Sequence, residues 1–166
     1  MVVDGLIVAV AQYLPFLIPV VAGIVWLFLP RRDKFGLAVQ GVVALVIAVV
    51  LIQLAAVAHT DPRPFVVDPS IRPLFSHPRD NGFPSDHTTL AATVALLVMV
   101  YRRWVGAALL AASVLVGVAR VAAHVHHGQD IVAGVLIAVV AVGATSAAWA
   151  WFRPRLTGRL AELTSL

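Results

Sequence analysis

Apolar residues form five runs along the chain, separated by three short polar links and one long one. A helix that crosses a membrane needs about 20 consecutive apolar residues, and four of the runs reach this length. The third run is shorter, but the two arginines that follow it can snorkel and extend its reach. We therefore predict an all-α fold, a polytopic membrane helical bundle with about five transmembrane helices over residues 5–29, 36–58, 85–101, 104–123 and 131–152.

The first run could be mistaken for a signal peptide. It lacks a basic segment in front of it and a small-residue cleavage site, and Asp4 precedes it. These features favour a retained helix. At this length we expect residues 1–166 to form a single transmembrane domain.

The long polar link, residues 59–84, is rich in proline and shows no apolar periodicity. Such a segment is predicted to be a loop, and a long loop beside regular elements often carries function.

Composition supports the membrane interpretation, with 61% hydrophobic residues, 12% charged residues and a mean hydropathy of +0.96. A sequence pI near 10.7 could suggest a nucleic-acid partner. The basic residues form short clusters at the ends of apolar runs, however, so membrane topology explains them better and no nucleic-acid partner is expected. The chain has no cysteine, which excludes disulfides and thiolate chemistry.

The charges predict an orientation, because five spans send alternate links to opposite sides of the membrane. One set of links holds eight of the twelve basic residues, namely Arg31, Arg32, Lys34, Arg102, Arg103, Arg153, Arg155 and Arg159. The other set holds all six histidines and six of the eight acidic residues. By the positive-inside rule the first set faces the cytoplasm. The amino terminus, the long loop and the histidines are therefore predicted at the outer face.

Three stretches on the outer side combine residue types that bind and cleave phosphates: "DPRPF" (61–65), "FPSDHTT" (83–89) and "ARVAAHVHHGQD" (119–130). Arginine forks bind the equatorial oxygens of a phosphoryl group bidentately, so Arg63 and Arg120 are candidate ligands. Arg120 lies near the end of an apolar run, where an unpaired guanidinium is costly. Snorkelling toward water is the alternative explanation for Arg120.

The second stretch begins a predicted helix. Ser85 at its start could bind an anion through its hydroxyl and the free backbone N–H groups, or could be a plain helix N-cap. His87 falls in the first turn, where it could give a proton to a leaving oxygen.

The third stretch offers a nucleophilic histidine and a carboxylate to orient it. His126 and Asp130 are four residues apart, and His127 and Asp130 are three apart, so spacing on a helix permits either pair. A metal site is another interpretation of the three histidines, but His124, His126 and His127 would share one face only on an irregular loop.

The three stretches together resemble the type 2 phosphatidic acid phosphatase superfamily, membrane lipid phosphatases related to vanadium haloperoxidases. That family's signature has three parts: a lysine followed after six residues by Arg-Pro; Pro-Ser-Gly-His; and Ser-Arg followed after five residues by His and after three more by Asp. Matching positions here are Arg63, Pro64, Pro84, Ser85, His87, Arg120, His126 and Asp130. The resemblance selects His126 over His127.

The resemblance also implies roles. His126 becomes phosphorylated, Asp130 orients it and His87 protonates the leaving group. The phosphate is held by Arg63, Ser85 and Arg120. No metal and no cofactor are implied.

Three positions depart from the signature. Ala56 stands where the lysine would fall, so Gln53 or His59 could replace that phosphate contact. Asp86 replaces the glycine next to His87 and could modulate it, and Ala119 replaces the serine. The form "FPSDHTT" is similar to a bacterial branch, the undecaprenyl-diphosphate phosphatases, which recycle the cell-wall lipid carrier and confer bacitracin resistance. The family usually has six spans, so this shorter chain is expected to lack the first.

We therefore expect a lipid phosphatase that removes the terminal phosphate of a polyprenyl diphosphate at the outer face of a bacterial plasma membrane. Another lipid phosphate, such as phosphatidylglycerophosphate, phosphatidate or a polyprenyl phosphosugar, is the alternative substrate. A non-enzymatic histidine-rich transporter or metal-binding protein is the alternative of another class. It would need polar residues along a path through the bilayer, where the runs offer little besides Gln40 and Gln53.

Overall fold

The computed structural model describes the backbone of residues 2–163 and the side chains of residues 2–154. Regular structure in this part of the chain is helical, apart from an isolated bridge between Pro62 and Asn81. The helices are α1 (Val2–Leu27), α2 (Arg31–Ala58), α3 (Pro64–Val67), α4 (Asp86–Tyr101), α5 (Arg103–Ala122) and α6 (Gly128–Leu163). The predicted all-α class is confirmed.

The five predicted spans correspond to the five longer helices. Helices α1, α2 and α5, and the part of α6 from Gly128 to Pro154, are long and apolar enough to cross a membrane. Helix α4 has 16 residues and is shorter than these four. Large apolar side chains such as Phe16, Leu17 and Val46 are exposed on α1 and α2, as expected where lipid rather than water is the solvent. The chain is a multi-pass membrane protein.

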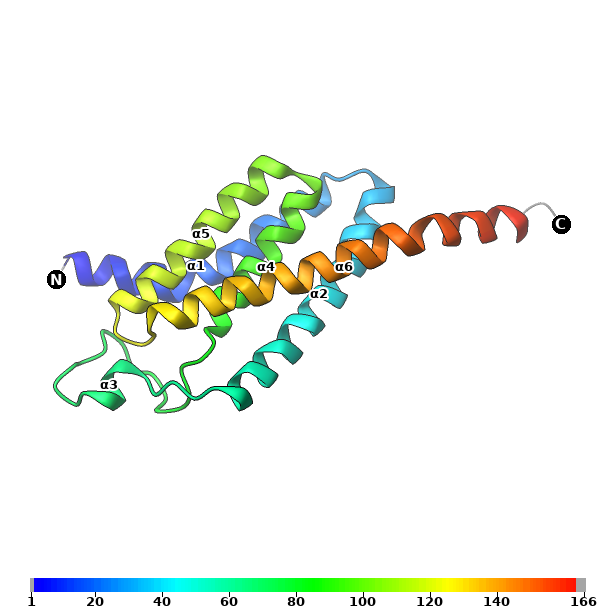
Figure 1. Ribbon diagram of the computed structural model, residues 1–166. Coiled ribbons are helices and arrows are strands. Elements are labelled where there is room, and N and C mark those ends of the chain that lie inside the picture. Colours follow the sequence, from blue (N-terminus) through cyan, green and yellow to red (C-terminus); the bar gives the residue numbers. More distant parts are fainter. Residues whose placement is uncertain (1, 164–166) are drawn as a thin grey trace.

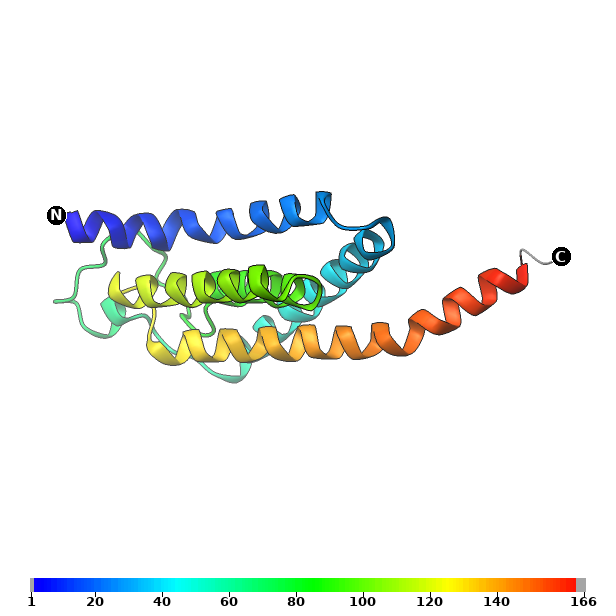
Figure 2. The same cartoon turned by 90° about the horizontal axis from the view of Figure 1, so that it is seen from above.

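Helix α4 occupies the centre of the bundle, where it contacts α1, α2, α5 and α6 (Figures 1 and 2). Its buried positions are mostly small residues, including Ala91, Ala92 and Ala95. Small side chains let neighbouring helices approach closely, as is common where helices pack in a membrane. The shortest span is therefore the one most enclosed by protein.

Helices α4 and α5 form a tight antiparallel hairpin, joined by the single residue Arg102. Gly106 makes the close approach possible, since a Cβ at this position would lie 2.2 Å from Met99 Cα. The hairpin returns the chain to the end of the bundle at which α4 began (Figure 1). The start of α4, the end of α5 and the start of α6 thus lie at one end.

Helix α6 is longer than predicted. The apolar run ends at Phe152, but the helix continues through Pro154 to Leu163 and extends past the other helices (Figure 1). Hydropathy marks only the apolar part of a helix, whereas the residues that follow include strong helix formers such as arginine, leucine and alanine. The side chains of Arg155 and Arg159, which entered the charge count, lie outside the described residues.

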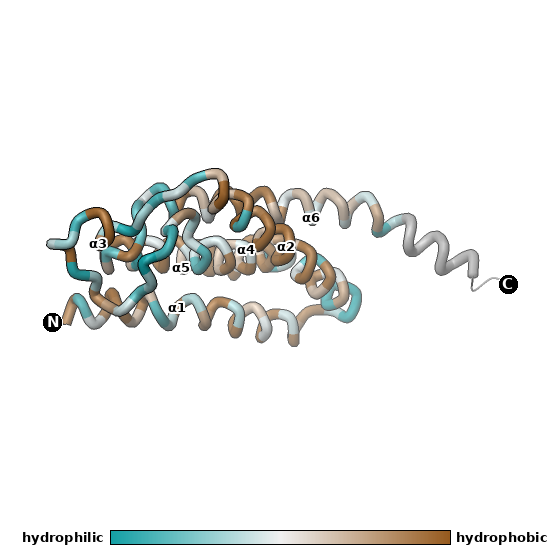
Figure 3. Tube along the Cα trace, turned by 90° about the horizontal axis from the view of Figure 1, so that it is seen from below, coloured by the Kyte–Doolittle hydropathy of each residue, from teal (hydrophilic) through white to brown (hydrophobic). Residues whose placement is uncertain are grey.

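The segment from 59 to 84 was predicted as a loop, and it contains the short helix α3 and the bridge of Pro62 with Asn81. It covers the end of the bundle where α1 and α6 begin (Figure 3). Hydrophilic residues gather along this segment, while the helices are mostly apolar (Figure 3). The core beneath it holds Phe65, Ala123 and Val125.

Candidate active site

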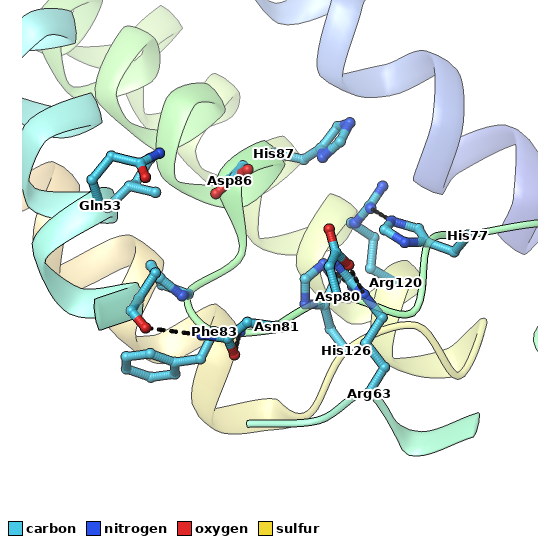
Figure 4. A pocket seen from close by; sticks show the side chains of 13 residues that line it. Gln53, Arg63, His77, Asp80, Asn81, Phe83, Asp86, His87, Arg120 and His126 are labelled. Carbon is cyan, nitrogen blue, oxygen red and sulfur yellow. Dashed lines mark hydrogen bonds and ion pairs between the residues drawn. The ribbon is translucent and has the colours of Figure 1, made fainter. Parts of the chain in front are cut away.

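A polar cavity of about 180 Å³ opens at the end of the bundle that residues 59–84 cover. Four of the six predicted catalytic and phosphate-binding residues line it, and they come from three separate parts of the chain: Arg63, His87, Arg120 and His126 (Figure 4). The fold thus brings the three sequence stretches to one cavity.

The end of α5 controls how Arg120 and His126 reach this cavity. His124 adopts φ 61°, the left-handed conformation that commonly ends a helix. The backbone N–H of His124 then donates to Val121 O at 2.9 Å, and that of Val125 donates to Arg120 O at 3.1 Å. These two bonds form a Schellman motif with Val125 buried beneath it. The chain therefore turns at His124, and His126 lies in the cavity wall two residues later.

His126 is held by Asp130 in the first turn of α6. Asp130 Oδ2 lies 3.1 Å from His126 Nδ1 and accepts a hydrogen bond of 2.8 Å from the backbone N–H of His127. The second bond is the helix-capping contact of a carboxylate near a helix start. A carboxylate at Nδ1 favours the tautomer with its proton there, which leaves Nε2 unprotonated.

The electrostatic surroundings keep His126 neutral. Burial has the largest effect on the pKa of His126 and lowers it. The hydrogen bond that His126 donates to Asp130 opposes this, but the charges of Arg120 and Arg63 add to the lowering, and the pKa of His126 lies below its ordinary value. A neutral imidazole with an unprotonated Nε2 can act as a nucleophile.

Arg63 lies beside that nitrogen. It is buried at the N-cap of α3, and its Nη1 donates to Val125 O at 2.7 Å and lies 3.4 Å from His126 Nε2. Its Nε donates to Asp80 Oδ1 at 2.9 Å. Although partial burial of Asp80 works against ionisation, this hydrogen bond and the charge of Arg63 hold its pKa below the usual value. The guanidinium is thus fixed next to the candidate nucleophile.

Arg120 is also buried, with 2% of its surface exposed. Its Nη1 donates to the backbone oxygen of Ala11 in α1 at 3.3 Å, and its Nη2 lies 2.9 Å from His77 Nε2. Its Nε has no hydrogen-bond partner within the described residues. The side chain of Arg120 therefore lies inside the protein at the cavity, which excludes the alternative explanation that it snorkels toward water.

His77 and Asp80 are cavity residues that the sequence argument did not name. The ring of His77 meets that of His126 edge to face, with centroids 6.2 Å apart. Burial, followed by the charges of Arg63 and Arg120, lowers the pKa of His77 to about 4. Both residues lie in the long polar link, which was predicted to be functional as a segment. The sequence could have indicated them, because a histidine and an aspartate in that link lie on the same predicted side of the membrane as the other candidates.

Ser85 lies behind the cavity rather than in its lining. It is fully buried at the N-cap of α4, with its hydroxyl 3.1 Å from Thr88 Oγ1 and its N–H donating to Asp130 O at 3.1 Å. Gly134 of α6 allows this approach, since a Cβ there would lie 2.7 Å from Thr89 Oγ1. Ser85 therefore joins α4 to α6, and its role as a phosphate ligand stays a prediction.

The residues that differ from the family signature, or that could replace its lysine, do not all line the cavity. Gln53 and Ala56 line the cavity, as does Asp86. His59 does not; its ring packs edge to face on Phe83, with centroids 4.6 Å apart. Of the two suggested substitutes for the lysine, only Gln53 is at the cavity.

His127 points to a different partner. Its Nδ1 lies 2.8 Å from Asp61 Oδ2, which also accepts a hydrogen bond of 2.6 Å from Gln129 Nε2. Candidate metal ligands within the described residues gather only at Asp61, His127 and Asp130, with ligand atoms within 4.8 Å of one another. The metal interpretation required His124, His126 and His127 together, and the structure does not group these three.

An apolar cavity of about 510 Å³ adjoins the polar one. The two share Asp86 and His87, and the apolar cavity runs between α1, α2 and α4 along Phe16, Leu45 and Leu90. An amphiphilic molecule could therefore place a polar group beside His126 and an apolar group among these helices.

Comparisons with known proteins agree with this arrangement. Residues 37–154 match the family model described as the PAP2 superfamily. The chain is 28% identical over 130 residues to the bacitracin transport permease protein BcrC of Bacillus licheniformis, covering 78% of this chain and 64% of that protein. It is 25% identical over 139 residues to the undecaprenyl-diphosphatase BcrC of Bacillus subtilis (strain 168), covering 84% and 71%. The chain thus spans slightly less than two thirds of the first relative's length.

A solved structure shows the same fold. The crystal structure of Aquifex aeolicus LpxE superposes with a TM-score of 0.73 and 22% sequence identity, covering 88% of this chain and 86% of that chain. At this identity the likeness concerns the arrangement of the helices.

Proposed function

The chain belongs to the PAP2 superfamily, and from this premise we propose that it is a membrane phosphatase that removes the terminal phosphate of a polyprenyl diphosphate. The observation that carries the proposal is the position of His126, which lines the polar cavity with its Nε2 3.4 Å from Arg63 Nη1 and with Asp130 at the other ring nitrogen. That combination supplies a nucleophile, a group that orients it and a cation for the phosphoryl oxygens.

The reaction has two steps. His126 Nε2 attacks the terminal phosphorus and the bond from phosphorus to the bridging oxygen breaks, while His87 gives its proton to the departing lipid monophosphate. A water molecule then attacks the phosphohistidine, His87 accepts the proton of that water, and inorganic phosphate is released with His126 restored. Asp130 stabilises the positive charge that His126 acquires during attack.

The arginines supply the electrostatic part of catalysis. Charge spreads over the equatorial oxygens of the transferring phosphoryl group, and preorganised donors aimed at those oxygens lower the barrier. Arg63 and Arg120 line the cavity and are assigned this role. Ser85 would join them only if its hydroxyl left Thr88. We expect neither a metal nor a cofactor to be required.

Two observations support a lipid substrate. The apolar cavity shares Asp86 and His87 with the polar one, so a diphosphate headgroup at His126 could continue into an apolar tail between α1 and α4. The BcrC protein of Bacillus subtilis carries the name undecaprenyl-diphosphatase. We propose that this chain acts on the same class of lipid, at the outer face of a bacterial plasma membrane.

Phosphate release by the purified protein in detergent micelles tests the proposal. Polyprenyl diphosphate, phosphatidate and phosphatidylglycerophosphate are compared, each with and without chelator and vanadate, with His126→Ala as the inactive control. We expect the diphosphate to be hydrolysed fastest, chelator to leave the rate unchanged, and vanadate to inhibit because it mimics the pentacoordinate phosphoryl group. Faster hydrolysis of either phospholipid would change the substrate assignment. Complete loss in chelator with recovery in zinc would refute the histidine mechanism.

A further inference from the structure

The guanidinium of Arg120 is held from two sides by groups outside the three signature stretches. One is the backbone oxygen of Ala11 in α1, and the other is Nε2 of His77 in the polar link. Helix α1 also precedes residues 37–154, which match the family model. Ala11 therefore lies outside the residues that match the family model, and His77 lies inside them but between the signature stretches.

The availability of the Ala11 oxygen follows from Pro15. In an α-helix the carbonyl of residue 11 accepts a hydrogen bond from the N–H of residue 15. Proline has no N–H, and its ring pushes against the carbonyl four residues earlier. Pro15 lies inside α1, so the buried Ala11 carbonyl has lost its usual intrahelical donor. A buried carbonyl in this state needs another donor, and Arg120 Nη1 supplies it.

The contact with His77 fixes the tautomer of that ring. A guanidinium can only donate, so His77 Nε2 must accept, and the ring proton must be on Nδ1. Such an acceptor exists only while His77 is neutral. The pKa of His77, lowered to about 4 chiefly by burial, ensures this at neutral pH.

With Nη1 and Nη2 each engaged, the Nε–H of Arg120 is buried without a partner in the described part of the chain. Arg120 itself lines the polar cavity, so whatever fixes its guanidinium also sets how that cation meets a group that enters there. We propose that Pro15, through the Ala11 carbonyl, and His77 form a clamp that holds the guanidinium of Arg120 in position to bind a phosphoryl oxygen. Pro15 and His77 are then positioning residues, and the inference rests on the proposed phosphatase function.

The clamp is tested on the full chain in micelles, with inorganic vanadate as the probe. Vanadate has no lipid tail, so a change in the apolar cavity, which Pro15 also lines, does not affect it. Pro15→Ala restores an N–H that competes for the Ala11 carbonyl. We expect the vanadate inhibition constant and KM to rise about 3- to 10-fold, with a smaller change in kcat. Helix formation itself should improve, so misfolding is not expected to cause the loss.

Gly23→Ala is the matched control. It also strengthens α1, and a Cβ at this position meets nothing within 4 Å, so the vanadate inhibition constant should not change. At His77, the Gln variant keeps an acceptor near the Nε2 position and the Phe variant removes it. We expect His77→Gln to stay close to the parent protein and His77→Phe to bind vanadate about 10-fold more weakly.

The outcomes separate the clamp from the function. If Arg120→Lys weakens vanadate inhibition while Pro15→Ala and His77→Phe match the Gly23→Ala control, the clamp is refuted and the phosphatase assignment is unaffected. If the parent protein neither releases phosphate nor responds to vanadate, the proposed function is refuted and the clamp's role with it.

Discussion

Asp130 Oδ2 contacts two neighbouring residues at once, lying 3.1 Å from His126 Nδ1 and 2.8 Å from the backbone nitrogen of His127. The first contact orients the candidate nucleophile and the second caps the start of α6. The same carboxylate therefore stabilises the start of α6 and favours the tautomer of His126 with its proton on Nδ1. Its other oxygen, Oδ1, is buried without a partner in the described residues.

Replacing Asp130 by asparagine should separate these two tasks. The amide oxygen can still accept from the His127 N–H, so the variant should fold. Asparagine cannot stabilise an imidazolium and can favour the wrong tautomer, so kcat should fall by orders of magnitude, by analogy with about 10⁴-fold for a triad aspartate. Phosphate release and thermal unfolding in micelles measure the two effects. A variant with near-normal kcat would remove Asp130 from the mechanism.

The neighbouring histidines should behave differently. His126→Ala should abolish turnover, because it removes the imidazole beside Arg63 that would accept the phosphoryl group. His127→Ala should keep substantial activity, since that ring pairs with Asp61 and does not line the cavity. To decide between His126 and His127, the phosphoenzyme is trapped in the His87→Ala variant and the modified residue is mapped by mass spectrometry. Phosphate recovered on His127 would show that the wrong histidine has been chosen.

The rate should remain high at mildly acidic pH. An ordinary histidine has a pKa of about 6.5, and burial lowers the pKa of His126 below this value. A lowered pKa means that the imidazole stays unprotonated, and so nucleophilic, to a lower pH. The acidic limb of kcat/KM, which reports the free enzyme, should therefore fall below pH 6.5. The substrate's own titration is measured by phosphorus NMR in the same micelles, and a limb above 6.5 after that correction contradicts the prediction.

The turn after α5 should accept glycine at position 124. His124 has φ 61° and its side chain is exposed, so it occupies the left-handed position of the Schellman motif where glycine is preferred. We expect His124→Gly to unfold at the same or a higher temperature and to keep its activity. His124→Val should be destabilised by about 1–2 kcal/mol, because a β-branched residue resists positive φ. Equal stability of the two variants would mean that this turn does not require the left-handed conformation.

Labelling with a membrane-impermeant thiol reagent tests the proposed orientation. The chain has no cysteine, so single cysteines can be placed at Ser70, in the long polar link, and at Asp33, at the start of α2. In intact cells Ser70→Cys should react and Asp33→Cys should react only after the membrane is permeabilised. The reverse pattern would place the cavity on the cytoplasmic side.

The helical architecture could be predicted from the sequence alone, and so could several of the residues that meet at the polar cavity. Apolar runs long enough to cross a bilayer leave few alternatives to a helix, because every backbone polar group in lipid must be bonded within its own segment. That Arg120, His126 and Asp130 lie close together could also be predicted from their spacing. These residues lie in one turn and in the helix ends on either side of it, so residues that are close in the sequence are also close in space.

Tertiary structure decided which other groups complete the cavity. Nothing in the local sequence links His77 or Ala11 to Arg120, since the contacts join residues 43 and 109 positions apart. Ser85 could be predicted as a helix start, but only the packing of α4 against α6 pairs its N–H with Asp130 O and buries the residue. The link between α2 and α4 has no periodicity, so its path depends on the helix ends it covers. Long-range contacts of this kind are absent from any single stretch of sequence, and they exist only once the helices have packed.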